Sequence, residues 1–401
     1  MLSGHSQITL PSRPRPELAT SRQSQRPVRL LLTSLFAFVV AAAIYGSFEE
    51  IGFDPAFPRH DNLGDFGSFY ESGRAALQGT NPYDIYPLTY FAAAGPGGAA
   101  INLNAPLSVV LFEILPTWTP YVAARIFNIA AVVAYLAAIG LLLASFPGAR
   151  QPWRLIWALG VSSFWGTLAL GQIYTFLALA TALAWVLLRK DRSTLAGIVI
   201  GFIAAIKPNF LLWPVMLVFA GNRRVALTAG TAWFVFCLIP LVQMGPQVYI
   251  EWAQAALATG QNGTATNGAL TGLAARLGIG SIGLLLNAAL TVAVGVWMFL
   301  RKPSAIQSSA VALITTLLAS PLAWTGYATL LLPVFFSRHR WSIAMMCAAG
   351  LLLIPVGSVL LPLSETSNLA MVIVGSAYTW AWLLLLASST TSATKCTAET
   401  P

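Results

Sequence analysis

The feature that most constrains this chain is a series of long apolar stretches that carry no charge. Two of them run from Leu30 to Phe48 and from Gly283 to Leu300. A helix rises 1.5 Å per residue, so about 20 residues cross the roughly 30 Å hydrocarbon layer of a bilayer. Apolar residues make up 57% of the 401 and charged residues only 9%, more than a soluble core could bury. We therefore expect an all-α polytopic membrane protein.

The first apolar stretch has an alternative interpretation as a cleaved signal peptide, because several arginines precede it. The stretch is too long for such a peptide. Its end, Tyr45-Gly46-Ser47-Phe48-Glu49, also lacks the small-x-small cleavage pattern. We expect it to remain in the protein as a span.

The net charge of +9 does not indicate a nucleic-acid partner, because the basic residues sit in short clusters at the ends of apolar stretches. This is the positive-inside pattern of membrane proteins. It predicts a multi-pass protein of a bacterial inner membrane with a cytoplasmic N-terminus. The other clusters assigned to the cytoplasm are Arg150/Arg154, Arg189–Arg192, Arg223/Arg224, Arg301/Lys302 and Arg338/Arg340.

The domain organisation follows from hydropathy. Residues 1–27 are rich in Ser, Pro, Gln and Arg and predict a disordered cytoplasmic tail. Residues 28–389 form one transmembrane domain of about 10–13 transmembrane or re-entrant helices, and 390–401 a C-terminal tail. Two stretches interrupt the domain: an external loop at 49–104 and a second polar, non-helical loop at 245–280.

Several of the expected helices are too short to span alone. They carry helix-breaking residues at their joints, which predicts broken or re-entrant helices lining a cavity buried in protein. These joints are Pro116 and Pro120, Gly171, Pro208 and Pro321.

Redox and metal chemistry find little support. The three cysteines, Cys237, Cys347 and Cys396, are far apart, and so are the three histidines. Neither a disulfide framework nor a zinc-binding spacing results. We expect no metal and no cofactor.

Acidic residues point to the first loop. The chain has 13, and seven of them fall between positions 49 and 84. Residues 65–79 have helical spacing, with Phe66, Phe69 and Tyr70 on one face, and predict an interfacial helix that Gly79 ends. Asp65 stands at the positive helix N-terminus, where it is a candidate general base. The alternative is that Asp65 only caps the helix.

The segment Gly64–Asp84, which opens with Asp65-Phe66 and ends with Gly79-Thr80-Asn81-Pro82-Tyr83, resembles the first external loop of glycosyltransferase family 87, within the GT-C superfamily. Three later stretches resemble the family in the expected order. They are Leu170-Gly171-Gln172 with Ala196-Gly197 and Lys207-Pro208, then Thr266–Leu270 with Arg276, and then Ala319–Trp324. Together the stretches cover roughly residues 30–335.

The resemblance implies a GT-C-like bundle that transfers a hexose, often mannose, with inversion and without a metal. The donor would be a polyprenyl-phosphate-sugar from the lipid bilayer, and the acceptor a glycan or glycolipid on the outer face. Asp65 matches the family's catalytic aspartate. Two departures stand out: Gly268-Ala269 replaces the family's Gln-Ser, and Thr325-Gly326-Tyr327 replaces the aromatic or histidine residues usual after Trp324.

A lipid phosphate that leaves with its charge needs a cation. Lys207 is our first candidate, because a lysine inside an apolar stretch is costly without an anionic partner. An ion pair with a neighbouring helix or a snorkelling side chain would also explain it. Arg276 and Arg125 are second choices, although Arg125 also fits the simple end of a span.

Four further residues are candidates for binding the sugar or the acceptor, together with Tyr70. Asn104, Gln172 and Asn267 would hydrogen-bond hydroxyls, and Trp324 would stack on a sugar face. Each also fits a local structural role. Two other functions remain open: a lipid-linked-sugar transporter or flippase built around the broken helices, and an inactive membrane scaffold of a polysaccharide assembly system.

Overall fold

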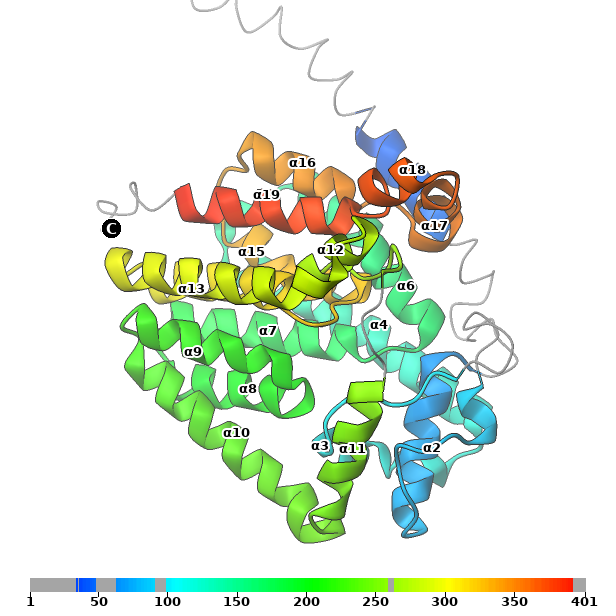
Figure 1. The fold of residues 1–401 in the computed structure, drawn as a ribbon. Coiled ribbons are helices and arrows are strands. Elements are labelled where there is room, and N and C mark those ends of the chain that lie inside the picture. Colours follow the sequence, from blue (N-terminus) through cyan, green and yellow to red (C-terminus); the bar gives the residue numbers. More distant parts are fainter. Residues whose placement is uncertain (1–33, 35, 48–62, 91–98, 259–262, 392–401) are drawn as a thin grey trace, which may run out of the picture.

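The structure, a computed structural model, describes residues 34, 36–47, 63–90, 99–258 and 263–391 (Figure 1). Within these ranges all regular elements are helical, and extended pairing is limited to isolated bridges, Tyr90 with Ala99 and Asn267 with Trp324. The predicted all-α fold is confirmed. The expected N-terminal tail 1–27, the loop residues 49–62 and most of the expected C-terminal tail lie outside the described residues.

Four helical segments in the described part of the chain are long and apolar enough to cross a membrane. They are α4 (Pro120–Ser145), α10 (Arg223–Met244), Gly280–Arg301 with η6 (Gly280–Ile282) and α13 (Gly283–Arg301), and Asn368–Thr391 with α18 (Asn368–Ile373) and α19 (Ala377–Thr391). The pair α16 (Ile343–Leu351) and Val356–Ser364, the latter comprising η8 (Val356–Leu360) and α17 (Leu361–Ser364), adds a fifth candidate that bends by 83°. The protein is therefore a polytopic membrane protein.

Shorter apolar helices accompany these spans, and they break where the sequence predicts. Gly171 separates α6 (Ser162–Leu170) from α7 (Tyr174–Arg189), and Pro208 separates α8 (Ser193–Ile206) from η5 (Pro208–Leu211) and α9 (Leu212–Phe219). Pro321 follows α14 (Ala305–Leu318) and precedes η7 (Thr325–Leu331) and α15 (Leu332–Phe336). Proline lacks the N–H that continues a helix, and glycine readily takes the left-handed conformation that ends one.

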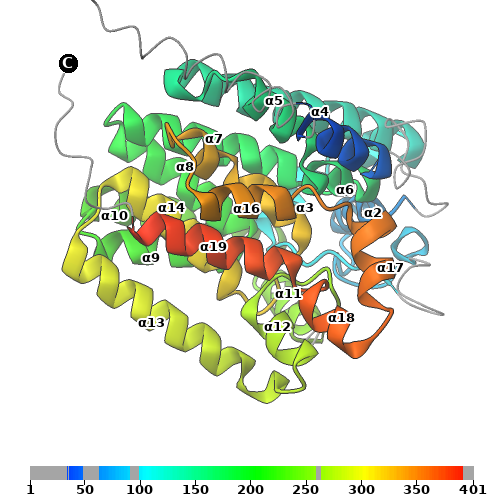
Figure 2. The same cartoon turned by 90° about the horizontal axis from the view of Figure 1, so that it is seen from above.

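The helices pack around a central element and with close contacts. Every residue of α14 from Ser308 to Leu318 is buried, with α9 and α19 on either side (Figure 2). α8 and α10 approach closely at Gly197 and Gly201, where a Cβ would lie 2.7 Å from Thr228 and 2.5 Å from the Ala229 carbonyl. Small residues four apart are the usual means by which membrane helices bring their backbones together.

The basic clusters gather at one end of the bundle. The Arg154 guanidinium donates to the Arg338 carbonyl at 2.7 Å, and Arg224 Nε donates to Thr194 Oγ1 at 3.1 Å. Lys302 Nζ donates to the Phe219 carbonyl at 3.1 Å, which joins the 301–302 cluster to the start of α10. Helices α2 (Asp65–Leu77) and α11 (Gln247–Ala258) lie at the opposite end (Figure 1).

The second polar stretch is not free of helix, so that part of the prediction is wrong. It contains α11 and α12 (Leu270–Arg276). Val248, Tyr249 and Trp252 of α11 face α10 and the chain at 103–105, where their apolar surface is covered. The polar residues that suggested a loop are concentrated in the short link between the two helices.

The interfacial helix is present as α2, which ends at Leu77 before Gly79 with φ of +67°. Its polar face, however, is covered by protein rather than water. Glu71 is only 1% exposed, ion-pairs with Arg74 at 2.6 Å and accepts a hydrogen bond from the Leu88 N–H. The other face stacks Phe69 on Phe112 of α3 (Leu107–Phe112), with ring centroids 4.6 Å apart. α2 is thus an integral part of the packed protein.

Candidate active site

Asp65 is the first residue of α2, and its carboxylate reaches across to the break between α6 and α7. Gln172 Nε2 donates to Asp65 Oδ2 at 2.5 Å, although 107 residues separate the two. Among the described residues this is the hydrogen bond that the carboxylate receives, and none comes from the first turn of α2. The side chain therefore does not serve as an ordinary helix cap. It is held by Gln172, with Oδ1 left for another partner.

Two glycines allow this contact. Gly171 ends α6 in the left-handed conformation, and its N–H and that of Gln172 bond back to Leu168 and Thr167. This closing pattern takes Gln172 out of the helix and frees its side chain. A Cβ on Gly171 would lie 2.6 Å from Phe66 Cβ, and one on Gly64 would lie 2.9 Å from the Leu170 carbonyl. The start of α2 and the end of α6 meet backbone to backbone.

The surroundings of Asp65 favour a protonatable carboxyl. Loss of solvent around the side chain raises the pKa of Asp65 above its ordinary 3.8, while the Gln172 hydrogen bond and the positive charge of Lys207 oppose the rise. The side chain keeps partial access to solvent. A carboxylate with a raised pKa binds a proton more readily, which suits a general base.

Lys207 is the cation nearest in effect to Asp65. It ends α8 because the following Pro208 disfavours helix for the preceding residue. Its side chain is only 7% exposed, and its Nζ has neither a hydrogen bond nor an ion pair with any described residue. Its contacts are ring faces: Nζ lies 5.4 Å from the centroid of Tyr174 and 5.3 Å from that of Tyr327.

Tyr174 and Tyr327 were not anticipated as site residues. Both are buried, with ring centroids 4.6 Å apart. Gly326 makes the pair possible, because a Cβ there would lie 2.4 Å from Cδ2 of Tyr174. The departure Thr325-Gly326-Tyr327 is thus a built part of the site. Their spacing gave a usable signal, since Tyr174 follows Gln172 by two residues and Tyr327 lies one 3₁₀ turn after Trp324.

Asn104 lies beside the Lys207 break. The next residue, Ala105, donates its N–H to the Ile206 carbonyl at 2.9 Å, and Tyr83 Oη donates to the Asn104 carbonyl at 3.0 Å. Tyr83 is itself set by the Asn81-Pro82-Tyr83 turn, in which Asn81 Oδ1 accepts the Tyr83 N–H. The side-chain Oδ1 of Asn104 is buried without a hydrogen-bond partner, and so is Oε1 of Gln172.

Arg276, Asn267 and Trp324 form a second group with different contacts. The Arg276 guanidinium donates to the carbonyls of Thr264 and Asn267 and to the hydroxyls of Ser376 and Thr379, at 2.7–3.3 Å. Asn267 Oδ1 accepts the N–H groups of Ala269 and Ala323. We call this group the Arg276 clasp. It connects to the Lys207 site through the Tyr327 N–H, which bonds to the Trp324 carbonyl.

The two remaining candidates lie on neighbouring elements. Tyr70 is buried on α2 and donates its hydroxyl to the Trp118 carbonyl at 3.0 Å. Arg125 is exposed on α4, two residues before Phe127, whose ring packs on Phe66. Both belong to the walls that hold α2, and neither was brought forward by the geometry as strongly as Gln172 and Lys207.

A polytopic helical bundle with a carboxylate and a buried cation at one end defines a class of membrane protein. The sequence profile of glycosyltransferase family 87 matches residues 102–321, more than half of the chain. The chain belongs to this family, which supports a membrane glycosyltransferase. The matched range contains Gln172, Tyr174 and Lys207, while Asp65 precedes it. No curated protein and no solved structure matches the chain.

Proposed function

We propose that the protein transfers a hexose, mannose in the first instance, from a polyprenyl-phosphate-linked donor to a glycan or glycolipid acceptor, with inversion at the anomeric carbon. The single observation that carries this proposal is the pairing of Asp65, held by Gln172, with Lys207, a buried cation without a protein acceptor. Membership of family 87 supports the general reaction.

Asp65 is the general base. Its Oδ2 accepts from Gln172, which fixes the carboxylate plane, and its Oδ1 takes the proton of the acceptor hydroxyl. The acceptor oxygen forms a bond to the anomeric carbon as the bond from that carbon to the phosphate oxygen breaks. The electron pair of the broken bond leaves with the lipid phosphate. Attack opposite the leaving group inverts the configuration.

Lys207 binds the donor phosphate. The charge on the leaving phosphate grows as the bond breaks, and a cation already fixed nearby stabilises that charge without reorganising. The faces of Tyr174 and Tyr327 stabilise the ammonium from behind. Because no described residue accepts a hydrogen bond from Nζ, its donors remain for phosphate oxygens.

Two buried acceptors support recognition of the sugar. Asn104 Oδ1 and Gln172 Oε1 have no partner within the described protein, and buried polar atoms usually have one. Sugar hydroxyls would donate to them. Trp324 is partly exposed next to the Arg276 clasp and offers an indole face for stacking.

The expected topology supports an outward-facing site in an inner membrane. α2 lies at the end of the bundle opposite the basic clusters (Figure 1). If those clusters follow the positive-inside rule, the Asp65 end faces away from the cytoplasm.

The test is sugar transfer from radiolabelled polyprenyl-phosphate-mannose and -glucose in membranes that contain the protein. Asp65→Asn keeps the shape and the Gln172 contact but removes the base, so transfer should fall by about 10²- to 10⁴-fold. Asp84→Asn is the matched control, since Asp84 is an exposed carboxylate of the same loop. Transfer that is indifferent to Asp65, or absent with both donors at normal protein levels, overturns the proposal and favours a lipid-sugar transporter or a scaffold.

A further inference from the structure

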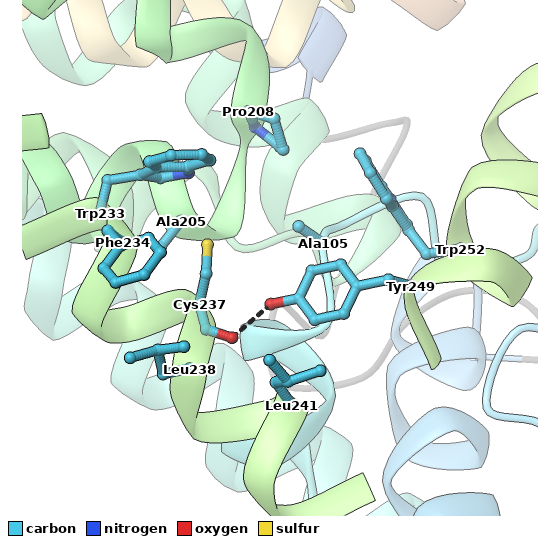
Figure 3. Close-up of a pocket in the computed structure, with 10 residues that line it drawn as sticks. All are labelled: Ala105, Ala205, Pro208, Trp233, Phe234, Cys237, Leu238, Leu241, Tyr249 and Trp252. Carbon is cyan, nitrogen blue, oxygen red and sulfur yellow. Dashed lines mark hydrogen bonds between the residues drawn. The ribbon is translucent and has the colours of Figure 1, made fainter. Parts of the chain in front are cut away.

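An apolar groove of about 370 Å³ lies next to the candidate active site. One wall is α10, with Trp233, Cys237 and Leu241, and the opposite wall is α11, with Tyr249 and Trp252 (Figure 3). Ala105, Ala205 and Pro208 line it between these walls. The sequence analysis assigned no role to any of these residues.

The groove is continuous with the Lys207 site. Ala205 and Pro208 lie on either side of Ile206-Lys207, and Ala105 directly follows Asn104. The hydrogen bond from the Ala105 N–H to the Ile206 carbonyl joins these segments where the groove begins. A ligand in the groove therefore has one end within a residue of the cation.

The lining offers a ligand hydrocarbon contact but few hydrogen bonds. The polar atoms of its two α11 aromatics are already used: Tyr249 Oη donates to the Cys237 carbonyl at 2.7 Å, and Trp252 Nε1 donates to the Leu103 carbonyl at 3.3 Å. The same bonds fasten α11 to α10 and to the chain before Asn104. What remains toward the groove is aromatic and aliphatic surface.

The groove also opens on a surface that suits lipid. α10 is one of the candidate spans, and its exposed side chains beside the groove are apolar, including Phe234 and Val242, the latter 86% exposed. An apolar side chain so exposed on a span contacts lipid tails rather than water. A long hydrocarbon chain can thus pass from the bilayer into the groove.

We infer that the groove between α10 and α11 binds the isoprenoid chain of the donor at its phosphate end, with the phosphate at Lys207. This inference rests on the proposed function and adds the element that reads the lipid. It also gives α11 a role, because its two aromatic side chains form the wall against which the chain packs. A carbon chain buried there gains affinity in proportion to the apolar area covered.

A second apolar groove of about 360 Å³ serves as the internal comparison. It lies between α7, α8 and α10, with Ala180, Leu183 and Phe202 among its lining residues. It is equally apolar, but its lining contains no residue adjacent to Lys207 or Asn104. Lipid-facing hollows of this size are thus not unique to the donor path, and only the first is joined to the site.

The first experiment compares donors of different chain length with Cys237→Trp, which fills the groove. KM for undecaprenyl-phosphate-mannose should rise about tenfold or more, equivalent to about 1.4 kcal/mol. KM for the short citronellyl-phosphate-mannose should change by less than about twofold, since its few carbons leave most of the groove unused. Ala180→Trp, in the second groove, should change neither. Equal effects on both donors, or none on the long one, overturn the inference.

The second experiment does not depend on transfer, so it separates failure of the inference from failure of the proposed function. Cys237 is alkylated with a membrane-permeant maleimide in a Cys347→Ser, Cys396→Ser background. Undecaprenyl phosphate should slow the reaction, while citronellyl phosphate and inorganic phosphate should not. Protection without sugar transfer would retain the groove and remove the enzyme assignment. Alkylation that undecaprenyl phosphate leaves unchanged would remove the groove.

Discussion

Two inward-facing cations of this protein are in opposite situations. Arg276 donates to four oxygen atoms of the protein, whereas Lys207 has no hydrogen-bond acceptor among the described residues. Both belong to stretches that resemble family 87, and the sequence alone made both candidates for the donor phosphate. The difference teaches which cation is available: one whose donors are all used holds the chain together, and one without acceptors can bind a ligand.

The energetics agree with this distinction. A buried charge without a partner costs free energy, which a protein retains only where a ligand supplies the partner. Arg276 instead resembles Arg154, which is also buried and donates to the carbonyls of Arg338 and His339. In both arginines the planar guanidinium joins segments distant in sequence, a task that suits its fixed fork of donors.

The largest expected effect separates the two cations by activity. Lys207→Met should reduce transfer by about 10²-fold or more, because the leaving phosphate loses its fixed positive charge. The protein should melt at or above the wild-type temperature, since a buried unpaired charge is removed. Transfer rates and melting in detergent on the same preparation test this. A lower melting temperature with retained transfer would break the comparison.

The next effect is on stability at the clasp. Arg276→Met leaves the carbonyls of Thr264 and Asn267 without their donor and should cost about 2–4 kcal/mol of unfolding free energy. Arg276→Lys should recover little of it, because an ammonium cannot reach four acceptors in a fork. Melting temperature and the yield of folded protein measure this. If Arg276→Met melts like wild type and loses only donor affinity, the clasp is a ligand site after all.

A smaller effect is expected at Gly326. Gly326→Ala introduces a Cβ where the Tyr174 ring lies, so it should cost about 1–3 kcal/mol and raise KM for the donor by displacing the ring from Lys207. Gly166→Ala is the matched control, because no atom lies within 4 Å of a Cβ there. The control should be stabilised by about 0.5–1 kcal/mol, as alanine favours helix. Similar behaviour of the two variants would argue against the tyrosine pair.

The smallest effect is a shift in pH dependence. Asp65 acts as a base only when ionised, and its pKa already lies above 3.8 because of desolvation, with the Gln172 hydrogen bond as the larger opposing influence and the Lys207 charge as the smaller. Gln172→Leu removes the larger one, so the acid limb of the transfer rate should move to higher pH. Lys207→Met should move the limb of its residual activity in the same direction by less. A limb that stays in place excludes Asp65 as the titrating group.

Local chemistry is what the sequence predicted well. The helix breaks at Gly171, Pro208 and Pro321 follow from the conformations that glycine and proline allow, and the start of α2 at Asp65 follows from spacing. The resemblance to family 87 also holds. These features depend on residues close together in the chain, which is why a single sequence reveals them.

Tertiary contacts are what it did not predict. Hydropathy assigned Glu71 to a wet face, yet the 87–90 segment covers it. Nothing near Lys207 in the sequence indicates that Tyr327, 120 positions later, lies against it. Polar composition hid α11, whose packing depends on apolar side chains at only some of its positions. Each miss concerns which surface meets which, and hydropathy carries no information on that.

The close approach of Gly64 and Gly171 has a consequence for how activity depends on assembly. Docking of the first loop and completion of the catalytic centre are one event, because the same contact that seats α2 delivers Asp65 to Gln172. A molecule whose loop is undocked would keep its spans and its helix content yet have no base in place. Transfer rate then reports the docked fraction, and once undocking dominates, each further 1.4 kcal/mol lost from that contact lowers the rate about tenfold. The enzyme's activity is in this sense a measure of loop docking.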